Sequence, residues 1–434
     1  MFPDLTKPNQ KIMEKLLHYA WKHKLYLLNN LKTIDGVPLE IIDPGLHNSD
    51  SGPDFFNAKI KLDGKLWAGN IEIHTKSSDW YNHKHDENDA YNSVILHVVE
   101  TIDQLNIKDS SGRIIPQWIL NIPQSTQENY HYLLHADTNI PCLNRLTDVP
   151  AIYMNDWLSA LLLERLERKS IQINNLLERN NNDWNEVFYV TLSRNFGFGI
   201  NNESFERLAK NLPLKYILKH SDSQIQTEAL FLGQAGLLNS ENIENDYYSV
   251  LQKEYRFLSK KYNLTSLDAT IFKNLRIRPN NFPHIKIVQL SGMIRKQTHI
   301  LSSLLEEDKL KNFQSLFDTE IHEFWNTHYH FEKESPFRPK KLGLSTINIL
   351  IINTVVPILF AYGQKKQNEK FIDKAIELLE SIKPENNFII HLFENRGINI
   401  QHAGDSQALI QLKREYCEQK KCIFCRIGHK ILSK

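Results

Sequence analysis

Two carboxylates and a histidine stand in a pattern that can hold a divalent metal ion. Asp54 follows a proline, and Glu72 and His74 come eighteen and twenty residues later. On two paired strands, about 4.8 Å apart, both acids can reach one cation. Residues at positions i and i+2 of a strand share a face, so His74 would stand beside Glu72. The spacing therefore predicts a divalent-metal site on a hairpin.

More histidines follow this pair in a polar segment, Ser77–Asp89. His83 and His85 have the spacing of two ligands on an extended segment, and Asp89 would complete an open three-ligand Zn²⁺ or iron site. A histidine-based metal hydrolase is therefore a rival hypothesis. Substrate or phosphate contact by His83 or His85 is a second alternative, and an ordinary solvated loop is a third. His97, within an apolar run, is expected to be a hydrogen-bonded core residue.

Short strands and one helix are predicted around these residues. The dipeptide Asp63-Gly64 is a strong hairpin signal, and it separates two runs with β character. The run that contains His97 is apolar enough for a buried central strand. The predicted order is a helix in Lys11–Tyr26, strands at Leu39–Asp43, Phe55–Leu62 and Leu66–Thr75, a helical connection, and strands at Val94–Val99 and Ile114–Ile122.

Helices are predicted for most of the chain after residue 145, where apolar residues recur every three or four positions. The fold class is therefore α+β followed by a large all-α domain. We place an α/β domain at residues 1–125, a connector at 126–152, a helical domain at 153–408 and a basic, cysteine-rich tail at 409–434. The predicted helices are Trp157–Leu177, Glu203–Leu212, Gln224–Leu238, Tyr247–Tyr262, His284–Leu305, Ile347–Tyr362 and Lys370–Ile382.

Three cysteines in the tail, Cys417, Cys422 and Cys425, have the spacing of metal ligands. Thiolates this close favour Zn²⁺ or an iron–sulfur cluster. A fourth ligand could be Cys142, which would tie the tail to the body of the protein, or His429, which would close a local knuckle. Three inert reduced thiols are the alternative. We predict convergence on Cys142 rather than His429.

The tail is also locally basic. Residues 409–434 contain seven Lys or Arg and two Glu, although the whole chain carries a net charge of only +1. The residues predicted to contact nucleic-acid phosphates are Lys420, Lys421, Arg426 and Lys430, with Phe424 available for base stacking. A solvated basic tail would have the same composition.

Composition and the ends of the sequence limit the class of protein. With 434 residues, 41% hydrophobic and 24% charged, the chain has the composition of a folded protein of more than one domain. The first ten residues lack an apolar signal segment, so we expect a cytoplasmic protein with reduced thiols. The most apolar run, Ile347–Gly363, is short for a membrane span and contains a proline, which favours a buried helix and no membrane partner.

The pair Pro53-Asp54, with Glu72-Ile73-His74 on the next strand, resembles the PD-(D/E)xK nuclease superfamily in this order of elements. The resemblance implies a restriction-endonuclease-like mixed sheet, Mg²⁺ or Mn²⁺ held by Asp54 and Glu72, and a water activated for phosphodiester cleavage. His74 stands where that superfamily has a lysine; a neutral imidazole can orient or deprotonate the water but supplies no fixed charge. The residues expected to support the site are Glu14, Glu40, Asn48, Asp50, His83 and His85.

Over nearly its full length the chain also resembles an uncharacterised bacterial family, domain of unknown function 2851. The motifs that carry this resemblance include His47-Asn-x-Asp50-x-Gly-Pro-Asp-Phe55, Gly69-Asn-Ile-Glu-Ile-His74, Val94-Ile-Leu-His-Val-Val99, Gly233-Gln-Ala-Gly-Leu237 and the cysteine tail. The family implies no activity. The predicted function therefore rests on the acidic hairpin and the cysteine tail. We favour a metal-dependent nuclease acting on DNA or RNA. The alternatives are a catalytically inactive nucleic-acid- or protein-binding module and the histidine-based hydrolase.

Overall fold

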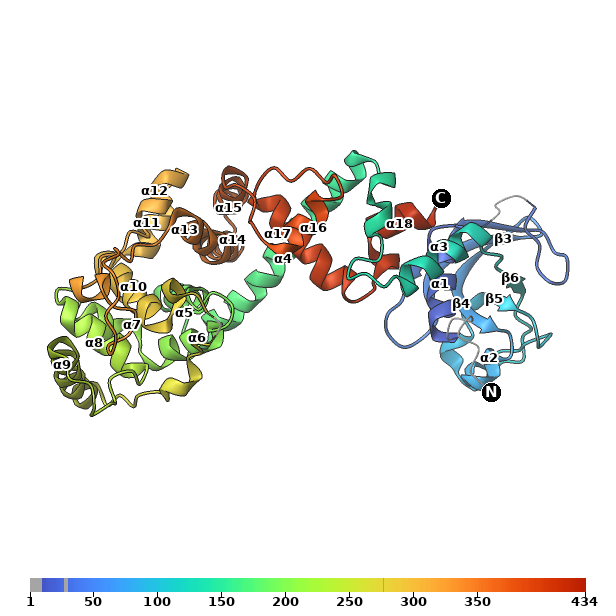
Figure 1. Ribbon diagram of the computed structural model, residues 1–434. Helices are drawn as coiled ribbons and strands as arrows, with labels where there is room; N and C mark the ends of the chain where they lie inside the picture. Colours follow the sequence, from blue (N-terminus) through green and yellow to red (C-terminus); the bar gives the residue numbers. More distant parts are fainter. Residues whose placement is uncertain (1–9, 27–29, 276) are drawn as a thin grey trace, which may run out of the picture. The chain divides into compact units, whose positions relative to one another are not determined.

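The computed structural model describes residues 10–26, 30–275 and 277–434, and the chain forms two compact units. The first unit comprises residues 1–157, 395–398 and 412–434; the second comprises 158–394 and 399–411 (Figure 1). The residues predicted as a connector, and residues 412–434 of the predicted tail, thus belong to the same unit as the sheet, whereas residues 409–411 belong to the second unit. Residues 1–9, on which the expected absence of a signal segment rests, lie outside the described part of the chain.

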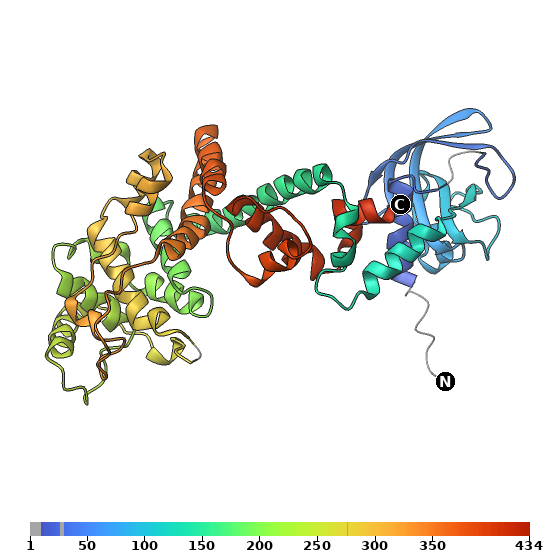
Figure 2. The ribbon, with the colours of Figure 1, turned by 45° about the horizontal axis from the view of Figure 1, so that its top comes forward.

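A curled, mixed sheet of six strands forms the centre of the first unit (Figure 2). The strand order is β1-β3-β4-β5-β6, with β2 beside β3. β1, β3 and β4 are antiparallel, whereas β5 is parallel to both β4 and β6. The strands are β1 Leu39–Asp43, β2 Leu46–His47, β3 Phe55–Leu62, β4 Lys65–Lys76, β5 Val94–Thr101 and β6 Gln117–Ile119.

The predicted hairpin is present, with β3 and β4 joined at Asp63-Gly64. Both turn residues have positive φ, 48° and 74°, and Leu62 pairs with Lys65 across the turn. Two consecutive residues with positive φ match the right-handed twist of the strands, and Gly64 adopts that conformation without strain. The turn thereby sets the β3–β4 register.

Helix α1, Gln10–Lys22, packs against β4 with one apolar face. Leu16, Leu17, Ala20 and Trp21 are buried there, at the helical spacing expected for such a face. The Trp21 indole also donates a hydrogen bond of 3.0 Å to the carbonyl of Pro44. This anchoring fixes α1 against the hairpin, so its polar side chains are held beside the strands.

The rest of the first unit is made of short helical segments. Between β4 and β5 the chain turns through α2, Asp79–Asn82, and two 3₁₀ turns, His85–Glu87 and Asp89–Tyr91. After β6 come α3, Gln124–His135, and a 3₁₀ turn at Leu143–Asp148. The C-terminal segment contains a π-helical stretch at Leu412–Cys417, a 3₁₀ turn at Cys422–Phe424 and α18, Arg426–Leu432, which packs against α3.

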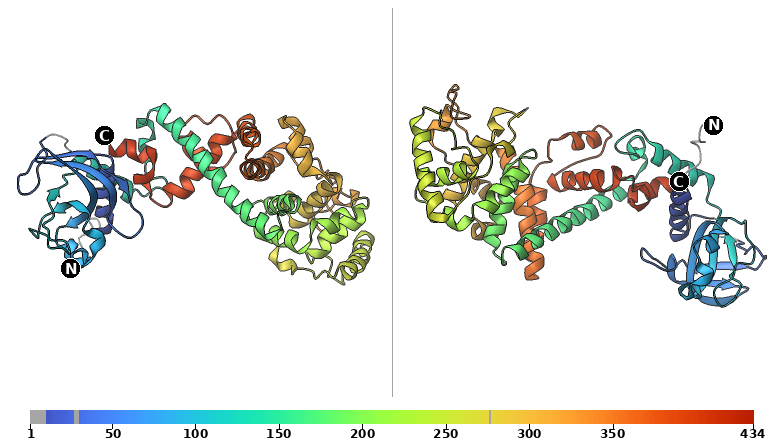
Figure 3. Two further views of the ribbon diagram at one scale, coloured as in Figure 1. Left: turned by 180° about the vertical axis from the view of Figure 1, so that it is seen from behind. Right: turned by 90° about the horizontal axis from the view of Figure 1, so that it is seen from below.

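The second unit contains helices and no strand within the described residues (Figure 3). The helix predicted at His284–Leu305 is two helices, because the polar residues Gln297 to His299 interrupt it between α10 and α11. The helices are α4 Ala151–Arg179 (which begins in the first unit), α5 Trp184–Phe196, α6 Asn202–Asn211, α7 Leu214–Leu218, α8 Gln224–Gln234, α9 Asp246–Tyr262, α10 Pro283–Lys296, α11 Ile300–Glu306, α12 Leu310–Ser315, α13 Leu344–Leu350, α14 Val356–Lys366, α15 Glu369–Ser381, α16 Phe388–Glu394 and α17 Ala403–Gln411.

Residues Leu344–Lys366 form the one described helix that is long and apolar enough to cross a membrane, and 61% of its apolar window is buried inside the protein. That burial is typical of the core helix of a soluble protein. A π-helical stretch, Ile351–Val355, interrupts it before Pro357. Proline has no N–H to donate to the carbonyl of Asn353, and the Asn195 side chain donates to that carbonyl instead, at 2.9 Å.

Candidate functional site

Asp54 and Glu72 are held together by hydrogen bonds between each carboxylate and the other strand's backbone. The Asp54 amide donates to Glu72 Oε2 at 3.1 Å, and the Ile73 amide donates to Asp54 Oδ2 at 2.9 Å. Asp54 lies just before β3 and Glu72 within β4, on the paired strands predicted from the sequence. The Glu72 side chain is 5% exposed and that of Asp54 22%, so Asp54 faces the more open side.

Helix α1 adds two residues to the acid pair. His18 Nε2 lies 3.3 Å from Asp54 Oδ2. Burial alone would lower the pKa of His18, but the Asp54 carboxylate raises it above its ordinary value; burial also raises the pKa of Glu14. Glu14 was predicted from the sequence and His18 was not. The signal that could have identified His18 is its i, i+4 spacing from Glu14, which places both on one face of α1.

Two histidines lie beside the second oxygen of Glu72, and a third contacts one of them. His85 Nε2 lies 3.0 Å and His74 Nε2 lies 3.5 Å from Glu72 Oε1. His74 Nε2 also lies 3.0 Å from His83 Nδ1, and its other nitrogen, Nδ1, lies 2.9 Å from His97 Nε2. The ligand atoms of His74, His83 and His85 all lie within 4.8 Å of one another. This is the spacing of ligands around a single metal ion.

Burial controls the protonation of this cluster. It lowers the pKa of His85 to about 4 and that of His97 to about 3, and neighbouring histidines add to the effect. The pKa of His74 lies well below its ordinary value for the same reasons. Burial, together with the negative charge of Asp54, raises the pKa of Glu72 well above its ordinary value. Neutral imidazoles keep a lone pair for a metal, and a cation would offset the buried negative charge.

The histidine-bearing connection between β4 and β5 is packed against a small hydrophobic cluster. Trp80 and Tyr91 are buried in that cluster with Val94, Ile107 and Ile115. The His85 ring stacks on Tyr91 with 3.8 Å between ring centroids. His85 is therefore held in one orientation by its aromatic neighbour, as a pre-organised ligand would be.

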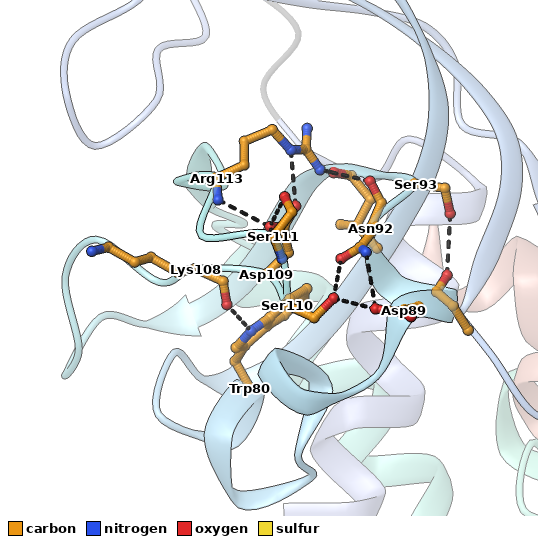
Figure 4. Close-up of polar contacts among 11 residues, drawn as sticks. Trp80, Asp89, Asn92, Ser93, Lys108, Asp109, Ser110, Ser111 and Arg113 are labelled. Carbon is orange, nitrogen blue, oxygen red and sulfur yellow. Dashed lines mark hydrogen bonds and ion pairs between the residues drawn. The ribbon is translucent and has the colours of Figure 1, made fainter.

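A polar network fixes the ends of this connection (Figure 4). Trp80 Nε1 donates to the carbonyl of Lys108 at 2.9 Å, and Arg113 binds both the Asp109 carboxylate, at 2.9 Å, and the carbonyl of Val94, at 2.7 Å. Asp89 accepts a hydrogen bond from Ser110 in the same network. Asp89, predicted as a third metal ligand, is not among the residues whose ligand atoms converge; His74 joins His83 and His85 instead.

The other predicted supporting residues, Glu40, Asn48 and Asp50, precede Asp54 in the sequence. Asn48 Nδ2 donates to the carbonyls of Asp50 and Pro53, each at 3.1 Å, and so shapes the loop that ends at Asp54. The Asp50 side chain itself is exposed. Glu40, on β1, is exposed and pairs with Lys61 at 3.1 Å. The structure thus brings Asn48 into the support of the site through the backbone, and it does not bring Glu40 to the carboxylates.

A family model described as "Protein of unknown function (DUF2851)" matches residues 14–388. The chain belongs to this family. No curated protein and no solved structure matches the chain. The DUF2851 match includes Asp54, Glu72 and the four clustered histidines, and it ends before Cys417. Membership therefore covers the acid–histidine site and leaves the three C-terminal cysteines outside the matched span.

All four cysteines of this DUF2851 protein line one small cavity in the first unit. Cys142, Cys417, Cys422 and Cys425 are buried and form no disulfide. His429, the alternative fourth ligand, does not line that cavity: its Nδ1 lies 2.5 Å from the Tyr19 hydroxyl on α1.

Most of the basic residues predicted to contact nucleic acid have contacts within the first unit. Lys420 donates to the carbonyl of Leu134, Arg426 pairs with Asp156, and the Lys430 ammonium lies 4.7 Å from the centre of the Tyr153 ring. Lys421 is exposed. In this DUF2851 chain the C-terminal segment is therefore docked on its own unit.

Proposed function

We propose that this protein is a metal-dependent hydrolase of nucleic-acid phosphodiesters, with Asp54 and Glu72 holding Mg²⁺ or Mn²⁺. The single observation that carries the proposal is the mutual placement of these two acids. Each carboxylate accepts a hydrogen bond from the backbone beside the other, so the two like charges are held close together. A divalent cation offsets such repulsion, and carboxylate oxygens are its preferred ligands.

The arrangement of elements supports the same proposal. An N-terminal helix precedes three antiparallel strands, β1, β3 and β4, and a helical connection leads to β5, parallel to β4. The acids lie at the start of the second and within the third of these three strands. This is the arrangement implied by the resemblance to PD-(D/E)xK nucleases, and α1 adds the further acid, Glu14, that such helices often supply.

Each residue of the site has a distinct task in this proposal. When bound, the metal polarises the phosphodiester and lowers the pKa of a water molecule. Asp54 and Glu72 orient the metal, and His18 orients Asp54 through their 3.3 Å contact. His74 replaces the usual lysine. As a neutral base it can accept a proton, and its contact with His97 fixes the orientation of its ring.

One observation favours a second candidate function, a hydrolase that uses a transition metal. His74, His83 and His85 present three nitrogen ligands close together, and Glu72 Oε1 is 3.0 Å from His85 Nε2. Such a nitrogen-rich set suits Zn²⁺ or Fe²⁺ better than Mg²⁺. Glu72 would then be shared between the acid pair and the histidines, since its two oxygens face different sides of the site.

Nuclease assays with matched variants test the proposal. Single- and double-stranded DNA and RNA are incubated with Mg²⁺, Mn²⁺ or Zn²⁺ and wild type, Asp54→Asn, Glu72→Gln or His83→Ala, with Asp50→Asn as the exposed control. Cleavage with Mg²⁺ or Mn²⁺ that is lost in the first two variants and kept in the other two supports the acid-pair nuclease. Cleavage that also disappears in His83→Ala supports the histidine-based site. Binding without cleavage under any metal would overturn both in favour of a binding module.

A further inference from the structure

Four cysteines from two distant parts of the chain line one cavity in the first unit, and no residue of the acid–histidine site lines it. Cys142 precedes the 3₁₀ turn at Leu143–Asp148, and the other three lie within nine residues near the C-terminus. Each is 6–8% exposed, and all four are reduced. The other residues lining their common cavity are Pro141, Tyr416 and Gly428, so it has no charged side chain. Four thiols facing one apolar space have the chemistry of a closed metal centre.

The backbone around these cysteines is shaped to bring them together. A side chain at Gly428 would place its Cβ 2.0 Å from the carbonyl oxygen of Cys422, so only glycine allows this approach. The amides of Ile427 and Gly428 donate hydrogen bonds to the Cys425 side chain. Amide donors to a cysteine sulfur orient that side chain, as the outer shell of a metal centre does.

The spacing of the sulfurs distinguishes between the occupants that four thiols can accept. A single Zn²⁺, with bonds of about 2.3 Å, holds its four sulfurs about 4 Å apart. Among the residues that the structure describes, only His74, His83 and His85 form a set of three or more ligands whose atoms all lie within 4.8 Å. Among these described residues the cysteines form no such set. The four cysteines nevertheless line one cavity, so they are neighbours that do not converge as the ligands of a single ion do.

We propose that Cys142, Cys417, Cys422 and Cys425 bind an iron–sulfur cluster. A cluster of several irons bridged by sulfide holds its cysteine ligands further apart than one ion does, which fits four cysteines that share a cavity without forming a single-ion set. The spacing of the three C-terminal cysteines, C-x₄-C-x₂-C, also occurs in proteins with such clusters. His429 does not line the cavity that the four cysteines share, so it is not assigned as a ligand.

The cluster would join the segment around Cys142 to the C-terminal segment within the first unit. The C-terminal segment already contacts α3 and α1: Asn129 donates to the carbonyl of Ile431 at 2.9 Å, and His429 contacts Tyr19. Tyr19 is adjacent in sequence to His18, which contacts Asp54. A cluster at the cysteines therefore holds in place the segment against which α1 packs, and its role is to stabilise the unit that carries the acid pair.

Metal and sulfide analysis of the full chain, purified without oxygen, tests this inference. We expect iron and acid-labile sulfide in equal amounts, visible absorbance that bleaches on reduction, and loss of both in Cys142→Ser and in Cys425→Ser. His429→Ala and Asp54→Asn should keep the iron, which separates this result from the fate of the proposed hydrolase.

Two outcomes would overturn the iron–sulfur assignment: stoichiometric zinc without sulfide, or a wild-type protein that is folded by circular dichroism and takes up no iron on reconstitution with iron and sulfide. Because a serine variant can fail to fold, the wild-type measurement alone is decisive. If Cys142→Ser kept all its iron and sulfide, Cys142 would be excluded as a ligand of the cluster.

Discussion

The Asp54 amide donates a 3.1 Å hydrogen bond to Glu72, while the Asp54 carboxylate accepts a 2.9 Å hydrogen bond from the amide next to Glu72. This reciprocal pair joins the start of β3 to the middle of β4. The two hydrogen bonds hold the acids close together although their negative charges repel each other. Structures keep such pairs where a cation is bound or a proton is shared.

Removing either charge should weaken metal binding. For Asp54→Asn and for Glu72→Gln we expect at least about a tenfold loss of Mn²⁺ affinity, because each amide removes a charged ligand but keeps the shape of the side chain. Isothermal titration measures the affinity. Asp50→Asn, which removes an exposed acid four residues away, should bind Mn²⁺ as wild type does; an equal loss in all three variants would mean that the effect is one of net charge alone.

The histidine set should bind Co²⁺ as a spectroscopic substitute for Zn²⁺. Visible absorption bands of tetrahedral or five-coordinate Co²⁺ are expected in wild type and should disappear in His85→Ala, which removes a ligand held by Tyr91. His97→Leu removes the outer partner of His74 and should weaken Co²⁺ binding by about 10- to 100-fold without abolishing it. Unchanged bands in His85→Ala would exclude this residue as a ligand.

Asn48 should act through the loop and not through the metal. Its side chain holds the carbonyls of Asp50, Ser51 and Pro53. Asn48→Ala leaves these groups without their donor and should lower the free energy of unfolding by about 1–3 kcal/mol. Urea denaturation measures this change. Ser49→Ala, at the neighbouring exposed position, is the matched control and should have no measurable effect.

Lys286, in α10, predicts a pH dependence of stability in the second unit. Its ammonium is buried, donates to Gln289 at 3.1 Å, and has a pKa lowered by burial to about 8. Between that pKa and the ordinary lysine value the unfolded state binds more protons than the folded state, so stability rises with pH across this window. Below it the buried charge destabilises the fold.

Lys286→Met removes that charge, so the variant should have a larger free energy of unfolding than wild type at pH 7. The gain should shrink by about 2 kcal/mol on raising the pH to about 9.5, as the wild-type lysine loses its proton. Urea unfolding at the two pH values gives the difference. Lys309→Met, at an exposed position, is the control for the general effect of replacing a lysine by methionine. If Lys286→Met raised the free energy of unfolding equally at both pH values, the lowered pKa of Lys286 would be contradicted.

Gly428→Ala tests the close approach at the cysteine cavity. The added Cβ would lie 2.0 Å from the Cys422 carbonyl oxygen, so the 3₁₀ turn must shift. We expect a melting temperature lowered by several degrees, since overpacking a buried site costs about 1–3 kcal/mol. Gly343→Ala is the matched control: its φ is −75°, and nothing lies within 4 Å of the new Cβ. A Gly428→Ala protein as stable as wild type would show that the turn is adaptable.

Local sequence determined the hairpin and its acids. β1 and β3 have the predicted bounds, and β4 extends the predicted strand by one residue at each end, because alternation and the Asp63-Gly64 turn act within a few residues. The same local pattern placed Glu72 and His74 on one strand two residues apart. The break between α10 and α11 was not predicted, because apolar periodicity continues on both sides of Gln297 and does not show where one helix ends and the next begins.

Only the tertiary structure decided which distant side chains meet. His18 reaches Asp54, His74 rather than Asp89 joins His83 and His85, and Cys142 rather than His429 completes the cysteine set. Each choice depends on how whole elements pack: α1 on β4, the connection on its hydrophobic cluster, and α18 on α3. Spacing along the chain constrains residues within one element, whereas contacts between elements follow from the burial of their apolar faces, which no short sequence window contains.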